Sequence, residues 1–321
     1  MIYRNLGKSG LMLSSLSYGS WVTFKNQVNV ALAEKLMGLA YDFGVNFFDN
    51  AEVYAQGESE RIMGKSLQNL SWSRDSFCIS SKVFWGGDKP TQKGLSRKHI
   101  FDACHAALKR MKLDYLDLYF CHRPDPSTPM YEIVSSMDTL IRQGKVLYWG
   151  TSEWEADQIM EAQLVAREWR LTPPTMEQPE YNLFKRDKIE KDYNSLYETY
   201  GLGTTIWSPL CSGLLSKKYF NGIPKKTRMS LKQFDWLRER FESKEGQLRL
   251  KKIKKLSSLA EELDISLPQL AIAWCLKNKR VSTVILGAST LKQLKENLES
   301  YKYLDHLSSE VMEKIEKIIK N

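Results

Sequence analysis

The sequence predicts a single α/β domain, residues 1–321, in which eight parallel strands form a closed (β/α)8 barrel. Short runs of β-branched or aromatic residues alternate along the chain with stretches of helical periodicity. This alternation is typical of βαβ units in a parallel sheet. Eight such units fit the usual length of a barrel, which is about 250 residues or more. An open, doubly wound sheet is the competing architecture.

Each predicted strand is a short run bounded by polar or glycine-containing segments. Residues 1–14 lie outside the barrel count, and the Lys-Ser-Gly turn between their two short runs predicts an N-terminal β-hairpin. The eight predicted barrel strands are residues 16–21, 45–49, 77–83, 115–121, 145–151, 175–181, 204–208 and 281–286.

A helical segment is expected after each strand because apolar residues recur there every three or four positions. Leu32, Leu36 and Leu39, for example, share one helical face, with Asn29 as a cap before them and Gly44 as a breaker after them. The regular alternation breaks once, between residues 211 and 267. We expect two or three helices there, in a long insertion between the seventh and eighth strands.

The insertion carries the excess positive charge of the chain. Residues 217–256 contain 14 Lys and Arg against four Asp and Glu, and the net charge of the whole chain is +9. A basic segment can bind nucleic acid, an anionic membrane surface or a phosphorylated small molecule. A solvated helical face is the plainer interpretation of the charge alone, and we expect no nucleic-acid partner.

Composition excludes several classes of protein. No run of about 18 apolar residues occurs, so no membrane span is expected, and residues 1–11 lack the apolar core of a signal peptide. The five cysteines are widely spaced and form no C-x-x-C pair. This spacing predicts reduced thiols in a cytoplasmic protein rather than disulfides or a zinc site. No metal site is expected.

The residues at the predicted strand ends give the strongest functional signal. In α/β barrels, functional side chains lie at the carboxyl ends of the strands. A purely structural face would show more glycine, proline and scattered charge, whereas here each strand end offers a polar or aromatic group. In chain order these are Ser20 and Trp21, Asp49, Lys82, His122, Ser152, Gln178, Trp207 and Ser208, and Gly287 with Ser289.

Asp49, Tyr54, Lys82 and His122 form a chemically meaningful set. The Lys82 ammonium is expected to favour the phenolate and to lower the pKa of Tyr54 from about 10, while Asp49 orients the lysine. A tyrosine tuned in this way can donate a proton to a carbonyl oxygen, and His122 would be a second donor to that oxygen. Each residue alone could be structural, but their joint occurrence favours catalysis.

The usual nucleotide-binding fingerprints are missing from the chain. Gly201-Leu202-Gly203 precedes a predicted strand instead of opening a helix, which indicates a turn rather than a Rossmann motif. No P-loop occurs either. A dinucleotide cofactor therefore does not follow from these motifs.

Three other motifs resemble the signatures of the aldo-keto reductase superfamily. Residues 44–54 (GVNFFDNAEVY) resemble its first signature, residues 111–124 (MKLDYLDLYFCHRP) the second, and residues 284–298, with Ile-Leu-Gly-Ala-Ser, the third. The motifs occur in order with the expected spacing, and the resemblance covers essentially the whole chain. It implies a TIM barrel that reduces aldehydes or ketones to alcohols with NADPH. Asp49, Tyr54, Lys82 and His122 match the catalytic tetrad, with Tyr54 as general acid.

The resemblance also implies a cofactor site. Ser152 and Gln178 match the groups that bind the nicotinamide carboxamide, and Trp207 matches the ring that stacks on the nicotinamide. Cations in the covering loop, including Lys225 and Lys226, favour NADPH over NADH. The other matching residues are Ser20, Trp21 and Gln27 near the reactive end, Ser208, Pro209, Leu210, Ser212 and Lys218 over the pyrophosphate, and Arg228, Gly287, Ser289, Gln293, Glu296 and Asn297 around the adenosine and 2′-phosphate.

Within the superfamily, the chain most resembles the voltage-gated potassium channel beta subunits. Similar phrases include Trp-Val-Thr-Phe at 21–24 and Trp-Gly-Thr-Ser at 149–152. This branch implies a homotetramer, a membrane channel as partner and, as an alternative function, an NADPH-binding regulatory subunit with little turnover. The animal subunits usually have Asn where His122 stands, so His122 restores the full reductase tetrad. Glu153 replaces an Asn or Arg and brings a carboxylate near the carboxamide.

The expected substrate is a small carbonyl compound. Trp21, Trp85 and Tyr54 predict an aromatic-walled pocket with one cation, Arg123, at its edge. Such a pocket would accept many small aldehydes, dicarbonyls or aryl carbonyls.

Overall fold

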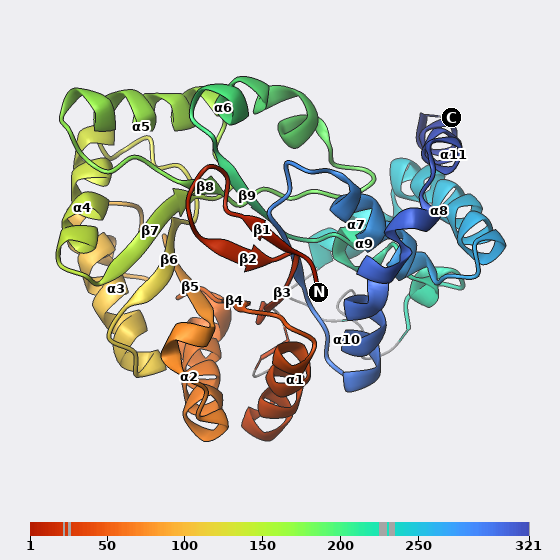
Figure 1. The fold of residues 1–321 in the computed structure, drawn as a ribbon, viewed down its shortest axis with the longest axis horizontal. Coiled ribbons are helices and arrows are strands. Elements are labelled where there is room, and N and C mark those ends of the chain that lie inside the picture. Colours follow the sequence, from red (N-terminus) through yellow and green to blue (C-terminus); the bar gives the residue numbers. More distant parts are fainter. Residues whose placement is uncertain (22, 25–26, 225–229, 231–234, 321) are drawn as a thin grey trace.

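Eight parallel strands close into a barrel in the computed structural model, and helices surround it (Figure 1). The structure describes residues 1–320 apart from 22, 25–26, 225–229 and 231–234. The barrel strands are β3 (Leu16–Gly19), β4 (Phe47–Asp49), β5 (Cys78–Val83), β6 (Leu116–Cys121), β7 (Val146–Thr151), β8 (Met176–Glu177), β9 (Gly203–Ile206) and β10 (Thr283–Leu286).

The pairing of the first and last barrel strands decides between the two architectures. β3 pairs in parallel with both β4 and β10, and the remaining strands follow in chain order from β4 to β9. The closed barrel is therefore confirmed and the open sheet is excluded. β3 and β8 end earlier than predicted because the chain leaves the ladder there for the rim of the barrel. In β8 the ladder stops shortly before Pro179, which has no N–H to donate.

Helices follow the strands as the sequence predicts, and polar caps begin several of them. The Asn29 side chain accepts a hydrogen bond from the backbone N–H of Leu32 at 3.0 Å, and Ser96 accepts one from His99 at 3.3 Å. The helices that follow barrel strands are α1 (Val30–Asp42), α2 (Glu58–Leu70), α3 (Arg97–Met111), α4 (Met130–Arg142), α5 (Ala156–Glu168), α6 (Asn194–Thr199), α9 (Leu267–Lys277) and α10 (Leu291–Leu298).

The predicted helical insertion between β9 and β10 is present. It contains α7 (Asp235–Glu242) and α8 (Lys244–Glu262), which come before α9. The last helix, α11 (Ser309–Lys320), lies against α8, where the Lys252 ammonium donates to the carbonyl oxygen of Ile319 at 2.6 Å. The described helices of the insertion are thus part of the helical layer at one side of the barrel (Figure 1).

An N-terminal hairpin closes the amino end of the barrel. β1 (Tyr3–Asn5) and β2 (Met12–Ser14) pair antiparallel, as predicted. Leu6 and Leu13 are fully buried and belong to the cluster of apolar side chains inside the barrel. Gly7 has a φ of +59°, and a Cβ there would lie 2.1 Å from the carbonyl oxygen of Gly201. Only glycine allows this close contact between the hairpin and the start of β9.

The alternation of side chains along each strand decides which residues face the barrel interior. Phe120 in β6 belongs to the interior cluster, so His122, two residues later, points the same way. By the same alternation, Asp49 points inward like Phe47 in β4, and Lys82 points inward near the end of β5. Three consecutive strands therefore direct polar side chains into the mouth of the barrel.

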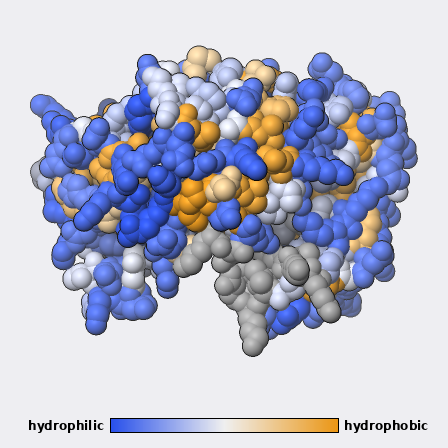
Figure 2. Space-filling model, turned by 90° about the horizontal axis from the view of Figure 1, so that it is seen from below, coloured by the Kyte–Doolittle hydropathy of each residue, from blue (hydrophilic) through white to orange (hydrophobic). Residues whose placement is uncertain are grey.

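The outer surface is largely hydrophilic. On the side that carries α1, α2 and α10, apolar residues gather near the centre and hydrophilic residues surround them (Figure 2). Buried residues such as Met63 and Leu67 lie on the inner face of α2. Within the described ranges, no helix is long and apolar enough to cross a bilayer.

Candidate active site

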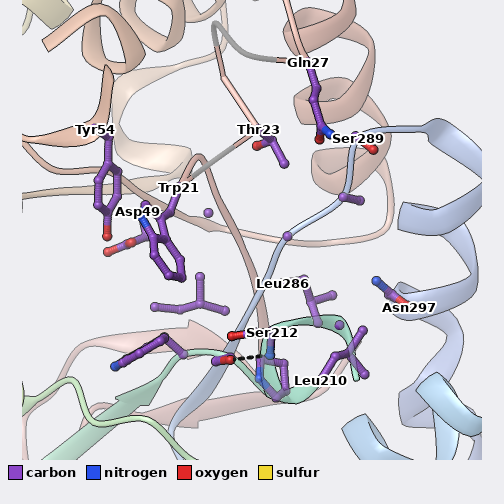
Figure 3. Close-up of a pocket in the computed structure, with 18 of the residues that line it drawn as sticks. Trp21, Thr23, Gln27, Asp49, Tyr54, Leu210, Ser212, Leu286, Ser289 and Asn297 are labelled. Atoms are coloured by element: carbon purple, nitrogen blue, oxygen red, sulfur yellow. Dashed lines mark hydrogen bonds between the residues drawn. The ribbon is translucent and has the colours of Figure 1, made fainter. Parts of the chain in front are cut away.

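A cavity of about 1150 Å³ opens at the carboxyl ends of the barrel strands. Sites for a single drug-sized molecule usually measure about 300–1,000 Å³. The cavity extends from Tyr54 and Trp21 at one end to Gln27, Ser289 and Asn297 at the other (Figure 3). It therefore has room for an elongated ligand together with a second small molecule.

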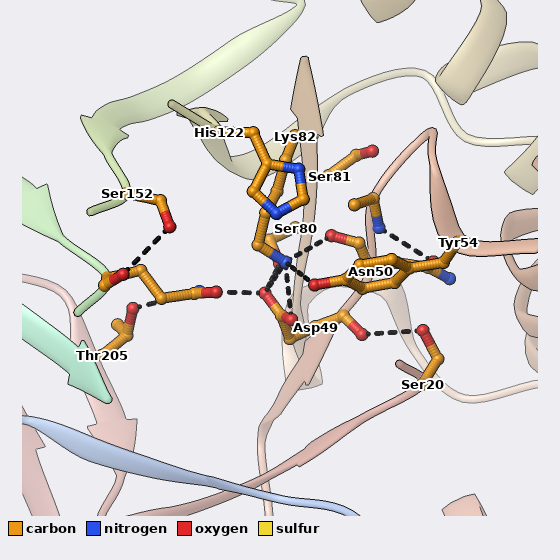
Figure 4. Close-up of polar contacts among 12 residues, drawn as sticks. Ser20, Asp49, Asn50, Tyr54, Ser80, Ser81, Lys82, His122, Ser152 and Thr205 are labelled. Carbon is orange, nitrogen blue, oxygen red and sulfur yellow. Dashed lines mark hydrogen bonds and ion pairs between the residues drawn. The ribbon is translucent and has the colours of Figure 1, made fainter. Parts of the chain in front are cut away.

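A buried ion pair lies beneath the first end of the cavity. Lys82 is fully buried, and its Nζ lies 2.7 and 2.6 Å from the two carboxylate oxygens of Asp49 (Figure 4). The same ammonium donates to the backbone oxygen of Asn50 at 2.7 Å and to the Tyr54 hydroxyl at 3.2 Å. A lysine ammonium has three protons and accepts no hydrogen bond. These four oxygens therefore fix it between the carboxylate and the phenol.

Further donors hold the Asp49 carboxylate. The Ser80 hydroxyl donates to Oδ1 at 2.8 Å, and the Gln178 side-chain amide donates to the same oxygen at 3.1 Å. That amide also lies within 3.3 Å of the Thr205 hydroxyl. The network joins the carboxyl ends of β4, β5, β8 and β9, so the position of the ion pair is determined by four strands.

The Tyr54 hydroxyl contacts the ammonium, yet its pKa is not lowered. Burial raises the pKa of Tyr54 well above 10, Asp49 raises it further, and Arg123 opposes the shift. The sequence-based expectation of a lowered pKa is contradicted because the cost of burying a phenolate outweighs a cation whose charge Asp49 largely neutralises. The phenol is protonated at neutral pH, which is the form that can donate a proton.

His122 is a neutral imidazole beside the phenol. Burial is the main cause that lowers the pKa of His122 well below 6.5, and the charges of Lys82 and Arg123 lower it further. The His122 ring lies 5.9 Å from the Tyr54 ring, measured between centroids. Its Nδ1 is buried and has no hydrogen-bond partner in the part of the chain that the structure describes. The imidazole can therefore act as a neutral hydrogen-bonding group.

Aromatic side chains form the walls at this end of the cavity. The Trp21 ring lies 6.4 Å from the Tyr54 ring and 5.6 Å from the Trp207 ring, edge to face in the second case. Trp85 packs edge to face against the imidazole at 5.1 Å, and Arg123 lies over the Trp85 ring. The structure thus brings together all the residues that the sequence predicts for the substrate pocket.

Ser20 differs from the other described residues predicted for the cofactor because it does not line the cavity. Its side chain is buried, and its hydroxyl donates to the backbone oxygen of Asp49 at 3.1 Å. Tyr18 in β3 packs outside the barrel with the helices. Ser20 has the same orientation as Tyr18, whereas Gly19 and Trp21 line the cavity. Ser20 therefore supports the backbone at Asp49 from behind.

The loop that follows β9 lines the cavity with irregular backbone. Ser208, Cys211 and Ser212 have φ values of +57°, +49° and +57°, a left-handed conformation that costs free energy and often marks functional sites. The Ser212 N–H donates to the Ser208 hydroxyl at 2.9 Å. Other predicted cofactor residues that line the cavity are Gln27, Pro209, Leu210, Lys218, Gly287, Ser289, Gln293, Glu296 and Asn297. Arg228, Lys225 and Lys226 lie outside the described residues.

Glu153 holds the Trp207 indole. Its Oε1 accepts hydrogen bonds from Trp207 Nε1 at 3.0 Å and from the backbone N–H of Glu180 at 2.5 Å. Lys188 lies 3.4 Å from its other carboxylate oxygen. Glu153 itself has a φ of +61°. Protein groups therefore engage both oxygens of the carboxylate that the sequence brings next to Ser152.

Sequence reasoning missed several residues of the site. Ser80 and Thr205 precede Lys82 and Trp207 by two positions, so the alternation along the strands could have identified them as inward-facing. Ser266, which caps the start of α9, also lines the cavity. No local sequence signal distinguishes it from the capping residue of any other helix.

The model of the Aldo/keto reductase family matches residues 15–320. The chain belongs to the aldo/keto reductase family. The match begins at the entry to β3 and includes every barrel strand and every helix around the cavity. Membership supports an oxidoreductase on a TIM-barrel fold, in a family whose members generally use NAD(P)H. The predicted superfamily is confirmed, and its potassium channel beta-like branch stays a prediction.

Proposed function

We propose that this aldo/keto reductase is an NADP(H)-dependent carbonyl reductase that converts aldehydes or ketones to alcohols. The observation that carries the proposal is the buried Lys82–Asp49 pair, whose ammonium lies 3.2 Å from the Tyr54 hydroxyl at the aromatic end of a large cavity. Tyr54 is the general acid in this proposal, and His122 is a second donor to the substrate oxygen.

The donor set along the cavity fits a nicotinamide dinucleotide. The Gln178 side-chain N–H2 group is bound by Asp49 and Thr205, which leaves its carbonyl oxygen to accept from a carboxamide. Ser152 contributes a hydroxyl close by, since its Oγ donates to the backbone oxygen of Gln178 at 2.9 Å. The Trp207 indole, held by Glu153, offers an aromatic face.

In this proposal, the far end of the cavity binds the phosphates of NADPH. Ser289 and Gln293 line the cavity where α10 begins, and the start of a helix presents backbone N–H groups that favour anions. Lys218 adds a cation to the loop at 208–218. These groups support binding of the phosphorylated cofactor. We propose the same role for Lys225, Lys226 and Arg228, which lie outside the described residues.

The chemistry follows from the residues around the carbonyl. A bound reduced nicotinamide would supply a hydride to the carbonyl carbon. Tyr54 donates its proton to the carbonyl oxygen as negative charge develops there, and Lys82 stabilises the phenolate that remains. Asp49 holds the ammonium in place. His122, kept neutral by its surroundings, orients the carbonyl oxygen through a hydrogen bond.

Turnover of small carbonyls tests the proposal. NADPH oxidation would be followed with methylglyoxal, 4-nitrobenzaldehyde, phenanthrenequinone and a sugar aldehyde as substrates. Tyr54→Phe should lower kcat by about 10²–10⁴-fold, the usual contribution of a general acid, and should retain NADPH binding. Tyr41→Phe is the matched control, because it removes a phenol hydroxyl that donates to the Ser76 hydroxyl at 2.9 Å, outside the cavity. Turnover by Tyr54→Phe close to that of the unmodified protein would exclude this mechanism.

The resemblance to channel beta subunits supplies the alternative. A regulatory subunit would bind NADPH tightly, turn over none of these substrates, form a homotetramer and co-purify with a membrane channel. We expect turnover because His122 completes the set of donors around the cavity. We also propose that the protein works in the cytoplasm, where NADPH and small carbonyls are available.

A further inference from the structure

Arg123 is a cation of the site that the proposed chemistry does not use. It follows His122 at the carboxyl end of β6 and lines the cavity. Its Nη1 donates to the carbonyl oxygen of His122 and lies 3.4 Å from the Ser152 hydroxyl. Its guanidinium carbon lies 5.3 Å from the centroid of the Trp85 ring. All of these partners are uncharged.

Some partly buried arginines of the fold have an acidic partner, whereas Arg4 and Arg280, like Arg123, bond to uncharged groups. Arg74 pairs with Asp117 at 2.6 Å, and Arg186 pairs with Glu190 at 2.8 Å. Within the described residues, Arg123 forms no ion pair. Arg123 differs from Arg4 and Arg280 because it lines the cavity, where a bound anion can supply the counter-charge that its neutral partners do not.

The carboxylates near Arg123 are already occupied. Asp49 pairs with Lys82. Asp125, two residues along the chain, accepts from the backbone N–H of Leu95 at 2.7 Å and from the Thr128 hydroxyl at 2.8 Å. The aromatic end of the cavity therefore carries one positive charge that is not compensated by the described residues.

The position of Arg123 relates this charge to the reacting groups. Its charge acts on both Tyr54 and His122, because it contributes to the lowered pKa of His122 and opposes the rise in the pKa of Tyr54. The Trp85 ring beside it is 37% exposed and offers a flat apolar surface. A guanidinium binds a carboxylate through two parallel hydrogen bonds, and an aromatic face favours a planar ligand.

We infer that Arg123 binds a carboxylate of the substrate, and that the preferred substrates are planar carbonyl compounds that carry a carboxylate, with formylbenzoates as the simplest examples. The inference rests on the proposed reductase function and deepens it. The carboxylate supplies the missing counter-charge, while the aromatic part of the substrate lies along Trp85 and the carbonyl faces Tyr54.

A matched pair of substrates tests the inference. 4-Carboxybenzaldehyde and methyl 4-formylbenzoate differ mainly in charge, and their kcat/KM values would be compared at neutral pH with saturating NADPH. We expect the unmodified enzyme to prefer the acid by about 10-fold or more. Arg123→Gln should reduce kcat/KM for the acid by about 10- to 100-fold, the loss expected for charge-assisted hydrogen bonds. The loss for the ester should be smaller, so that the acid-to-ester ratio of kcat/KM falls by about 10-fold or more, and Arg123→Lys should recover part of the loss for the acid.

Two controls separate binding at Arg123 from general charge effects and from turnover. Lys98→Gln removes an exposed cation of α3 that pairs with Asp102, and it should leave the acid-to-ester ratio unchanged. Terephthalate carries the anion but no aldehyde. Its binding, followed by quenching of tryptophan fluorescence without any turnover, should weaken in Arg123→Gln.

The outcomes distinguish this inference from the proposed function. Equal losses for acid and ester in Arg123→Gln, or no preference for the acid in the unmodified enzyme, would overturn the inference and leave the reductase in place. If neither substrate is reduced, the proposed function fails, and the terephthalate measurement still decides whether Arg123 binds a carboxylate.

Discussion

Replacing Lys82 with methionine would leave the Asp49 carboxylate buried without its cation. The two side chains are 0% and 3% exposed, and their ion pair is 2.6 Å long. Removing one partner of a buried pair costs about 3–5 kcal/mol of folding stability. Asp49 would keep its hydrogen bonds from Ser80 and Gln178. We therefore expect Lys82→Met to cost about 3 kcal/mol, at the low end of that range.

Urea unfolding followed by circular dichroism measures this loss. The decisive comparison is the double variant Asp49→Asn/Lys82→Met, which removes the unpaired charge and keeps an acceptor for the Ser80 hydroxyl. It should be more stable than Lys82→Met by at least about 1 kcal/mol, a coupling typical of residues in direct contact. A loss below about 1 kcal/mol in Lys82→Met, or no recovery in the double variant, would refute the view that the pair is held together by mutual compensation of charge.

Three further predictions follow from the polar network. Burial raises the pKa of Glu177 to about 8, so the folded protein loses stability as the pH rises from the usual pKa of a carboxyl group toward 8. The loss is about 1.4 kcal/mol per pH unit, and Glu177→Gln should remove it in urea unfolding at pH values of about 5, 6.5 and 8. An unchanged pH dependence of stability in this variant would contradict the assignment. Glu153→Ala should weaken NADP+ binding about 3- to 10-fold by releasing the Trp207 indole, whereas Glu153→Gln should retain most of the affinity. Fluorescence titration measures both affinities, and equal losses would show that the hydrogen bond from the indole is unimportant. Because the pKa of His122 lies well below 6.5 and that of Tyr54 well above 10, kcat/KM for an uncharged aldehyde should be flat between pH values of about 7 and 9, and a limb centred near 7.5 would mean that another group controls turnover.

The barrel itself could be predicted because its signals are local and repeated. Alternating strand and helix periodicities, together with caps such as Asn29 and Ser96, are written in short segments of sequence. Strand ends were less predictable. β8 is only two residues long, and Pro179 has no N–H for the ladder, although the predicted strand extends to residue 181.

The candidate site was predicted in its members but not in its electrostatics. Strand ends and motifs indicated Asp49, Lys82 and His122, and the fold brings them to the mouth of the barrel. The pKa of Tyr54 depends on how far water is excluded from the phenol, which no spacing in the sequence reveals. The contact between Glu153 and the Trp207 indole likewise depends on the left-handed backbone at Glu153. The sequence alone does not reveal where this carboxylate points.

The hairpin at the amino end of the barrel also bears on how the chain folds during synthesis. Arg4 donates to the carbonyl oxygens of Leu276 and Val281, and the latter lies 277 residues further along the chain. Ribosomes add about 5–20 residues per second, so roughly 15–60 s pass before these partners exist. Throughout that time β3 has no β10 beside it and keeps an open edge that could pair with other chains. Barrel closure is therefore a late event, and the nascent polypeptide is most exposed to aggregation just before its last strand emerges.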